Sequence, residues 1–244
     1  MNGYMKPQDI EKRSFEIITA ELGERTFPAG IAEVVKRVIH TTADFDYADS
    51  LAFSPDVIEK AKAALAAGAT VVTDTNMALS GVSKVTLAKL GGKAVCLMAD
   101  EQVASEAKAR GVTRAVVSME HAAKLEGPLI FAIGNAPTAL IRLHELIEEG
   151  IVAPALVIGV PVGFVNVVEA KELFIGGNTP YIIARGRKGG SNVAASIVNA
   201  LLYQMVHREG FNCCRQTTVW PTRGTDRRPF QSRPKVPIRK LFPS

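Results

Sequence analysis

Residues 129–149, LIFAIGNAPTALIRLHELIEE, contain the pattern that decides the fold. The first five residues are all apolar and do not alternate with polar ones, which is typical of a strand buried on both faces of a sheet. A turn with a glycine, Gly134–Thr138, follows them, and from Pro137 onward apolar residues recur at helical spacing. The stretch therefore predicts a strand, a tight connection and a helix, which is the repeating unit of a parallel sheet.

The same alternation continues on both sides of this stretch. Further strands are expected at residues 70–73, 94–98, 114–118, 155–160 and 181–184. Helices are expected between most of these strands and after the last one, at residues 83–90, 100–110, 137–149, 166–172 and 192–206. We therefore expect an α/β fold in three layers, with a mainly parallel sheet of five or six strands and helices on both faces.

The chain ahead of residue 70 is predicted to be largely helical. Residues 7–22 and about 28–39 place apolar side chains at helical spacing. Ser54, with a proline directly after it, predicts the N-cap of a third helix. The acidic residues of segment 44–49 do not fit the spacing of a calcium loop, so we expect a solvated loop or a cap there.

Length and composition indicate one large soluble domain. The chain has 244 residues and a mass of 26.1 kDa, with 47% hydrophobic and 22% charged residues. The longest apolar stretch, residues 153–168, is too short for a membrane span, and residues 1–13 contain no apolar run of the signal-peptide kind. We expect a cytoplasmic protein with no membrane partner, whose single domain covers residues 1–207.

The excess positive charge lies in a C-terminal tail. Residues 208–244 contain nine Lys or Arg against two acidic residues, whereas the rest of the chain has 20 basic and 22 acidic residues. The net charge of +5 therefore gives no support for a nucleic-acid partner. Because the tail holds five prolines and shows no periodicity, we interpret it as a weakly packing or foreign extension, or alternatively as a partner-binding arm.

The usual signatures of nucleotide and metal sites are absent from the sequence. No two glycines are separated by a single residue, which excludes the GxGxxG fingerprint, and no Gly-Lys-Ser or Gly-Lys-Thr occurs. The four histidines have no HxH or HxxxH spacing, and the three cysteines form no CxxC pair. We therefore expect neither a nucleotide cofactor nor a protein-held metal.

Arg37 and His40 form one candidate site at the end of the second predicted helix. They are three residues apart, so both side chains leave the same face of the last turn. The negative end of the helix dipole favours the protonated imidazole, which suits a general acid working near neutral pH. From the spacing alone, the favoured interpretation of His40 is a surface histidine that caps a helix end.

Four polar or glycine-rich loops follow predicted strands, at residues 73–76, 134–138, 160–164 and 185–192. In a parallel sheet such loops share the carboxyl edge, where ligands bind. The last loop carries Arg187, Lys188 and Ser191 and leads into a helix, which suits a carboxylate or a phosphate. Each loop taken alone can also be ordinary turn chemistry, and the last can be an exposed basic turn.

Several motifs resemble those of the precorrin-8X methylmutase family of cobalamin biosynthesis, also called cobalt-precorrin-8 methylmutases. They occur in the family's order over about residues 7–205, and the tail has no counterpart among them. The matching stretches are Arg13–Ile18, Arg37–Asp44, Thr73–Met77, Ala132–Leu140, Pro161–Val165 and Gly186–Asn192.

The resemblance implies a reaction, namely migration of a methyl group from C11 to C12 of a contracted tetrapyrrole ring, without SAM, nucleotide or redox cofactor. It implies that His40 is the proton donor and acceptor, that Ser14 and Arg37 contact the substrate, and that the protein is a homodimer with sites near the subunit interface. For Ser14 the alternative is an ordinary helix-surface serine.

The residues themselves suit such a substrate, which carries several carboxylates. Arg37, Arg187, Lys188 and amides near Ser191 can bind them through charge-assisted hydrogen bonds. We also include Asn76 and Asn135 as candidate contacts, although both can instead stabilise their own turns.

Three other hypotheses remain open from the sequence: a nucleotide-dependent enzyme, a non-catalytic tetrapyrrole carrier, and an interaction protein that uses its basic tail.

Overall fold

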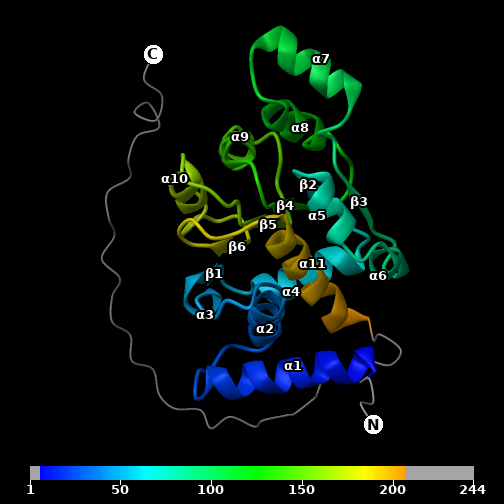
Figure 1. Ribbon diagram of the computed structural model, residues 1–244. Coiled ribbons are helices and arrows are strands. Elements are labelled where there is room, and N and C mark those ends of the chain that lie inside the picture. Colours follow the sequence, from blue (N-terminus) through cyan, green and yellow to red (C-terminus); the bar gives the residue numbers. More distant parts are fainter. Residues whose placement is uncertain (1–5, 207–244) are drawn as a thin grey trace. The chain divides into compact units, whose positions relative to one another are not determined.

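The computed structural model describes residues 6–206, and their centre is a six-stranded sheet (Figure 1). The strand order is β1-β6-β5-β4-β2-β3. β1 pairs with β6 in antiparallel fashion, whereas all other neighbours are parallel. The strands are β1 (Leu51–Phe53), β2 (Thr70–Thr73), β3 (Lys93–Val95), β4 (Leu129–Ile133), β5 (Leu156–Gly159) and β6 (Tyr181–Ala184).

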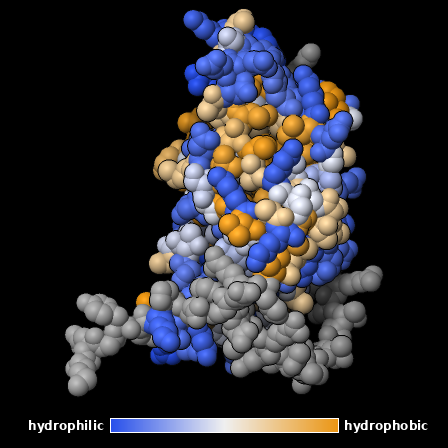
Figure 2. All heavy atoms as spheres, turned by 90° about the vertical axis from the view of Figure 1, so that its right-hand side faces the viewer, coloured by the Kyte–Doolittle hydropathy of each residue, from blue (hydrophilic) through white to orange (hydrophobic). Residues whose placement is uncertain are grey.

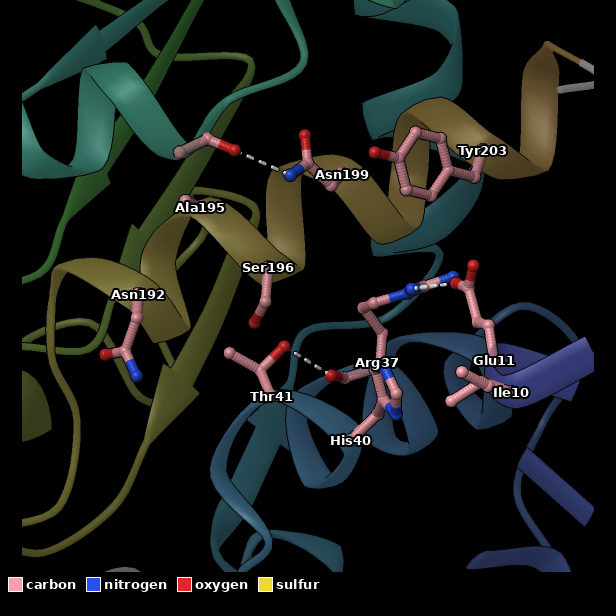
Figure 3. A pocket seen from close by; sticks show the side chains of 11 residues that line it. Ile10, Glu11, Arg37, His40, Thr41, Asn192, Ala195, Ser196, Asn199 and Tyr203 are labelled. Carbon is pink, nitrogen blue, oxygen red and sulfur yellow. Dashed lines mark hydrogen bonds and ion pairs between the residues drawn. The ribbon is translucent and has the colours of Figure 1, made fainter. Parts of the chain in front are cut away.

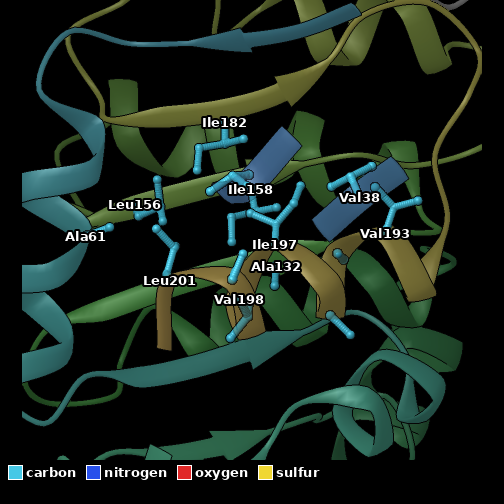
Figure 4. Packing of buried hydrophobic residues seen from close by; sticks show 14 of the residues in the cluster. Val38, Ala61, Ala132, Leu156, Ile158, Ile182, Val193, Ile197, Val198 and Leu201 are labelled. Carbon is cyan, nitrogen blue, oxygen red and sulfur yellow. The ribbon is translucent and has the colours of Figure 1, made fainter. Parts of the chain in front are cut away.

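One face of the sheet is covered by α2 (Ile31–Thr42), α4 (Val57–Ala66) and α11 (Ser191–Met205), and α1 (Pro7–Leu22) packs on α2. Figure 4 shows this layer, where Ala132, Ile158 and Ile182 of the sheet face Ile197 and Leu201 of α11. Burying these aliphatic side chains stabilises the fold by roughly 1.5–3 kcal/mol for each large one.

The other face of the sheet carries a second helix layer. The strand residues that alternate with the first set, such as Phe131 and Ile183, pack against Leu140 and Leu143 of α9 (Pro137–Glu148) and Met119 of α8 (Arg114–Ala122). α10 (Val167–Glu172) also lies in this layer, and α7 (Glu101–Arg110) packs on α8. Both faces are therefore buried, and the expectation of a three-layer α/β fold with a mainly parallel sheet of five or six strands is confirmed, with six strands present.

The strand predicted at residues 114–118 is wrong, because this segment begins helix α8. Thr113 is the N-cap, and its hydroxyl accepts a hydrogen bond from the Val116 N–H. The buried positions Ala115, Met119 and Ala122 recur at helical spacing, which the β-branched run at 116–117 concealed.

Three further differences lie ahead of β2 or beside it. β1 was not expected, because three residues are too few to show a pattern; they pair with β6 at the edge of the sheet. The acidic segment continues into a short helix, α3 (Tyr47–Ser50). Ser54 does not cap α4: its hydroxyl accepts a hydrogen bond from the Tyr181 N–H at 2.9 Å, and it thereby ties the end of β1 to β6.

The direction of the strand order reverses between β2 and β4. From β2 the chain moves outward to β3, and from β4 it moves the other way to β5 and β6. In open parallel sheets the crevice at such a reversal is the usual ligand site, at the carboxyl ends of the strands. Two short helices, α5 (Asn76–Gly81) and α6 (Lys84–Lys89), follow β2 at this point. No helix within residues 6–206 is both long and apolar enough to cross a membrane.

Candidate active site

A cavity of about 560 Å³ opens where α1, α2, the end of α5 and α11 meet (Figure 3). Arg37 and His40 both line it, which confirms that their spacing places them on one face of α2. The complete lining consists of Ile10, Glu11, Arg37, His40, Thr41, Gly81, Asn192, Ala195, Ser196, Asn199 and Tyr203.

Arg37 is held on three sides. Its guanidinium forms an ion pair with Glu11 of α1, and it lies 4.7 Å from the ring centre of Phe15 and 5.2 Å from that of Tyr203. The side chains of Arg37 and Glu11 are 19% and 15% exposed, so the pair is largely shielded from water. Cation–π contacts and a shielded ion pair fix the direction of the guanidinium at the edge of the cavity.

The ring of His40 stacks on that of Phe15, with 5.3 Å between the ring centres and 25° between the planes. Partial burial lowers the pKa of His40 below its ordinary value, and the nearby Arg37 lowers it further, whereas Glu11 acts in the opposite direction. The expectation that the helix end favours the protonated imidazole is therefore wrong for the protein alone. Burial and the charge of Arg37 outweigh the effect of the α2 dipole on this pKa. The hydroxyls of Thr41 and Thr42 donate to the carbonyls of Arg37 and Val38, so these carbonyls at the C-terminal end of α2 already have donors.

One stripe of α11 forms the opposite wall of the cavity. Asn192, Ser196, Asn199 and Tyr203 lie four, three and four residues apart, so they share a helix face. Asn199 accepts from the Ser83 N–H at 2.8 Å and donates to the carbonyl of Gly81 at 2.8 Å. The stripe thus carries polar groups into the cavity and fastens α11 to α5.

Asp74 joins the end of β2 to the loop after β4, where the strand order reverses. Its side chain is fully buried at the end of β2 and accepts hydrogen bonds from the N–H groups of Gly134, Asn135 and Ala136, at 2.9, 2.7 and 2.6 Å. Burial raises the pKa of Asp74, and the three N–H donors oppose that increase. The amides that lead into α9 therefore already hold an anion, which belongs to the protein itself.

The four loops expected at the carboxyl edge do come together. The Thr75 and Ser191 hydroxyls are 2.7 Å apart, and the Gly190 N–H donates to the carbonyl of Val160 at 2.8 Å. Asp74 joins the loop after β2 to the loop after β4. These bonds connect the loops after β4, β2, β6 and β5 in that order, so the edge forms one connected surface.

Lys188 connects this edge to the end of α2. Its ammonium lies 2.7 Å from Asp44 and 2.6 Å from Asp46, just beyond His40 in the chain. The hydrogen bond from Lys188 lowers the pKa of Asp44, and the two carboxylates raise the pKa of Lys188. Arg187 is instead exposed and lies over Phe164, at 5.4 Å from the ring centre.

Comparison with known proteins identifies the family. The family model described as Precorrin-8X methylmutase matches residues 9–204.

This chain belongs to the precorrin-8X methylmutase family.

Two relatives illustrate the similarity across this family. A Cobalt-precorrin-8 methylmutase from Salmonella typhimurium is 45% identical over 213 residues, which cover 84% of this chain and 99% of that protein. A Precorrin-8X methylmutase from Pseudomonas aeruginosa is 41% identical over 197 residues, which cover 80% of this chain and 94% of that protein.

A solved structure of the same family shares this fold. The crystal structure of precorrin-8X methyl mutase from Thermus thermophilus matches with a TM-score of 0.73 and 38% sequence identity. The match covers 79% of this chain and 95% of the Thermus protein, so it spans nearly the whole of that family member.

The other predicted site residues do not line the cavity. The Ser14 hydroxyl donates to the carbonyl of Ile10 at 2.9 Å, one turn away on α1. Asn76 begins α5 with an exposed side chain, and the side chain of Asn135 is also exposed beside the N–H that binds Asp74. Arg187, Lys188 and Ser191 lie on the loop and first turn that precede Asn192. The predicted tail, residues 208–244, lies outside the described residues.

Other residues of this site were not predicted from the sequence. Glu11, Thr41, Asn199 and Tyr203 line the cavity, and Asp74 organises the carboxyl edge of the sheet. The polar stripe on α11 is visible in the sequence as polar residues at helical spacing within an apolar helix, whereas Glu11 is 26 residues from Arg37 and gives no local signal. Within residues 6–206, no group of three or more His, Cys, Asp or Glu side chains is arranged to hold a metal ion.

Proposed function

We propose that this chain is an isomerase that moves a methyl group from C11 to C12 of precorrin-8X or of its cobalt-containing counterpart. The products are hydrogenobyrinate and cobyrinate, respectively. The observation that carries the proposal is His40, which borders a cavity of about 560 Å³ beside Arg37 in a member of the methylmutase family.

His40 supplies and recovers one proton in this proposal. The imidazolium protonates the conjugated macrocycle, the bond from C11 to the methyl group breaks as the bond to C12 forms, and the proton then returns to the imidazole. Substrate and product are isomers, so no other reactant is consumed. A positioned general acid typically contributes about 10²–10⁴-fold to such a rate.

The substrate itself prepares His40 for this role. In the protein alone, burial and Arg37 lower the pKa of His40, so the imidazole is mostly neutral at neutral pH. Carboxylates of the bound macrocycle bring negative charge next to the ring and raise that pKa. Protonation of His40 is thus coupled to occupation of the cavity by a polyacid.

The substrate's carboxylates are recognised by positively charged side chains that already form ion pairs within the protein. Arg37 is paired with Glu11, and Lys188 with Asp44 and Asp46. A substrate carboxylate can replace Asp44 or Asp46 on Lys188, because these pairs are well exposed and cost little to open. At Arg37, whose pair is shielded, the substrate carboxylate takes over the charge-assisted bond from Glu11. Arg187 has no ion pair within residues 6–206 and is available directly for such a carboxylate.

We also propose that two copies associate over the apolar face beside the cavity. Figure 2 shows the face of the molecule that lies on the right-hand side of Figure 1, near β3, α5 and α6. Apolar side chains gather on this face. Met77 of α5 and Val85 of α6 are 72% and 74% exposed, and Ile10 at the cavity is 51% exposed. A second copy that covers these side chains would remove apolar surface from water and narrow the opening of the cavity.

The association is tested by sedimentation velocity of Val85→Glu. A charge on the covered face shifts the protein to monomer, whereas Ile151→Glu, at an exposed apolar residue after α9, leaves the dimer intact. A dimer that persists in the Val85 variant, or a wild-type monomer, would contradict this interface.

The reaction is tested by incubating the purified protein with precorrin-8X and, separately, with cobalt-precorrin-8. Conversion of the absorption spectrum to that of the product, with no added cofactor, is the expected result for the natural substrate. A pigment that binds without any spectral change over time in both cases would overturn the proposal and indicate a carrier.

A further inference from the structure

Lys171 is a buried lysine in the helix layer opposite to the cavity. Its side chain is 0% exposed, whereas Glu169 and Glu172 on the same short helix face solvent. Its ammonium donates to the carbonyls of Gly186 and Lys188, both at 2.8 Å. Burial lowers the pKa of Lys171 to about 8.

This arrangement needs a physical reason, because a buried ammonium is costly unless its donors are satisfied. No carboxylate of residues 6–206 forms an ion pair with Lys171; its ammonium bonds backbone oxygens instead. Charge-assisted bonds to two carbonyls of one loop hold that loop more firmly than neutral bonds would.

The loop in question, residues 185–190, is held from a second side as well. The carbonyl of Arg187 accepts from the Gly163 N–H at 3.2 Å, and the Gly190 N–H donates to the carbonyl of Val160. A Cβ atom added at Gly189 would lie 2.0 Å from the oxygen of Val160, so the backbone is packed directly against the end of β5. The carbonyls of residues 186, 187 and 188 thus all accept hydrogen bonds, from Lys171 or from Gly163.

The same loop carries the groups that face the substrate in the proposed function. The side chain of Lys188 reaches Asp44 and Asp46 at the end of α2, and Arg187 lies over Phe164. Two residues further on, Asn192 lines the cavity. The backbone conformation of the loop therefore sets where two cations and the first turn of α11 are placed.

We propose that Lys171 is a positioning residue for recognition of the substrate's acidic side chains. Its two hydrogen bonds hold the backbone of residues 186–188 in one conformation, and this conformation positions Arg187, Lys188 and Asn192 for the substrate. Lys171 itself does not touch the substrate. This inference rests on the proposed function, because it assigns the loop to substrate carboxylates.

The inference is tested with Lys171→Met, which keeps most of the side-chain volume but leaves both carbonyls without a donor. Glu169→Gln, an exposed change on the same helix, is the matched control. We expect amide hydrogen exchange of residues 185–190 to rise by about tenfold or more in the Lys171 variant without ligand, while β4 and β5 stay protected. We expect affinity for hydrogenobyrinate to fall by about tenfold or more, with kcat at saturation changed less than about twofold.

Lys171→Gln, whose amide can still donate to at least one carbonyl, should recover part of the affinity and of the loop protection. It also replaces Lys171→Met if the methionine variant does not fold. A variant with unchanged loop exchange and unchanged affinity overturns the inference. So does exchange that rises equally in β4, β5 and the loop, because that result indicates a role in stability alone.

The two proposals fail in distinguishable ways. If the wild type neither binds hydrogenobyrinate nor converts its precursor, the proposed function falls, and the recognition role of Lys171 falls with it. If the wild type binds and the Lys171 variants bind equally well, only the positioning role is overturned.

Discussion

The carboxyl edge of the sheet and the cavity beside it hold their charges in opposite ways. At the edge, Asp74 and Lys171 are completely buried, and each bonds backbone groups rather than an opposite charge. In the cavity, Arg37 pairs with Glu11, side chain to side chain, and both remain partly exposed. The first arrangement fixes loops in one geometry, whereas the second can be opened.

This difference separates the parts of the site that must stay in place from those that must change. A carboxylate that accepts three N–H bonds has no alternative partner when substrate arrives. A guanidinium paired with a protein carboxylate can take a substrate carboxylate in its place, because one charge-assisted bond replaces another. We therefore expect Asp74 variants to affect stability, Lys171 variants to affect affinity through the loop that they hold, and variants in the cavity to affect turnover and affinity directly.

The largest effect is expected at His40. Replacing it with alanine removes the proton donor, so kcat should fall by at least about 10²-fold while hydrogenobyrinate still binds. His121→Ala is the control, because that histidine pairs with Glu106 on the distant α7–α8 pair. Steady-state kinetics followed by absorption measure kcat for both variants. Normal turnover in the His40 variant would refute its role as proton donor.

Next in size is the effect of removing the buried carboxylate at the edge. Asp74→Ala leaves the N–H groups of Gly134, Asn135 and Ala136 without their acceptor, and we expect a loss of about 2–4 kcal/mol in the free energy of unfolding. Asp100→Ala, an exposed N-cap of α7, should cost only about 1 kcal/mol. Urea denaturation of both variants measures these losses in the free energy of unfolding. Equal losses in the two variants would contradict the special role of Asp74.

Replacing Arg37 and replacing Glu11 in the cavity are expected to change the affinity for the pigment in opposite directions. Arg37→Met should weaken substrate binding by about tenfold or more, because one charge-assisted contact is lost. Glu11→Gln frees the guanidinium from its ion pair, so affinity should stay equal or increase by a few-fold. Titration with hydrogenobyrinate measures both, and a loss of affinity of similar size in both variants would show that the intact pair, not the free cation, is required.

The smallest effect concerns the titration of His40 in the protein without ligand. Burial and Arg37 lower its pKa, so its NMR midpoint should lie below 6.5, and the midpoint should rise in Arg37→Met because a positive neighbour is removed. Bound hydrogenobyrinate should also raise it. The pH profile of kcat reports the pKa of His40 in the substrate complex, and that of kcat/KM reports its pKa in the free protein. Because the reaction uses the imidazolium and bound substrate raises the pKa, kcat should decline at a higher pH than kcat/KM. A midpoint above 6.5 in the free protein would contradict the account of its surroundings.

Much of the fold was predictable because its signals are local. The strand at residues 129–133 and the helix that follows it can be read directly from apolar runs and helical spacing. Residues 114–118 were misassigned because a β-branched pair resembles a strand over a short window, although the longer spacing is helical. The three-residue β1 depends on pairing with β6, more than a hundred residues away, which no local pattern shows.

The candidate site was predictable only in part, for the same reason. Arg37 and His40 share one helix turn, so their spacing places them together. The partners that decide their chemistry, Glu11 and Phe15, come from a different helix and appear only in the folded chain. Lys171 did leave a trace, since it lies at helical spacing from the buried Val167 on α10, in a position where a lysine is unusual.

The buried carboxylate of Asp74 also limits what this scaffold can be turned into. Doubly wound proteins commonly keep a phosphate group at the amides where the strand order reverses, and here those amides are already occupied by Asp74. Redesigning the surrounding loops would not by itself create a phosphate-binding protein. A protein engineer would first have to delete the internal anion, and would then face a backbone that depends on it.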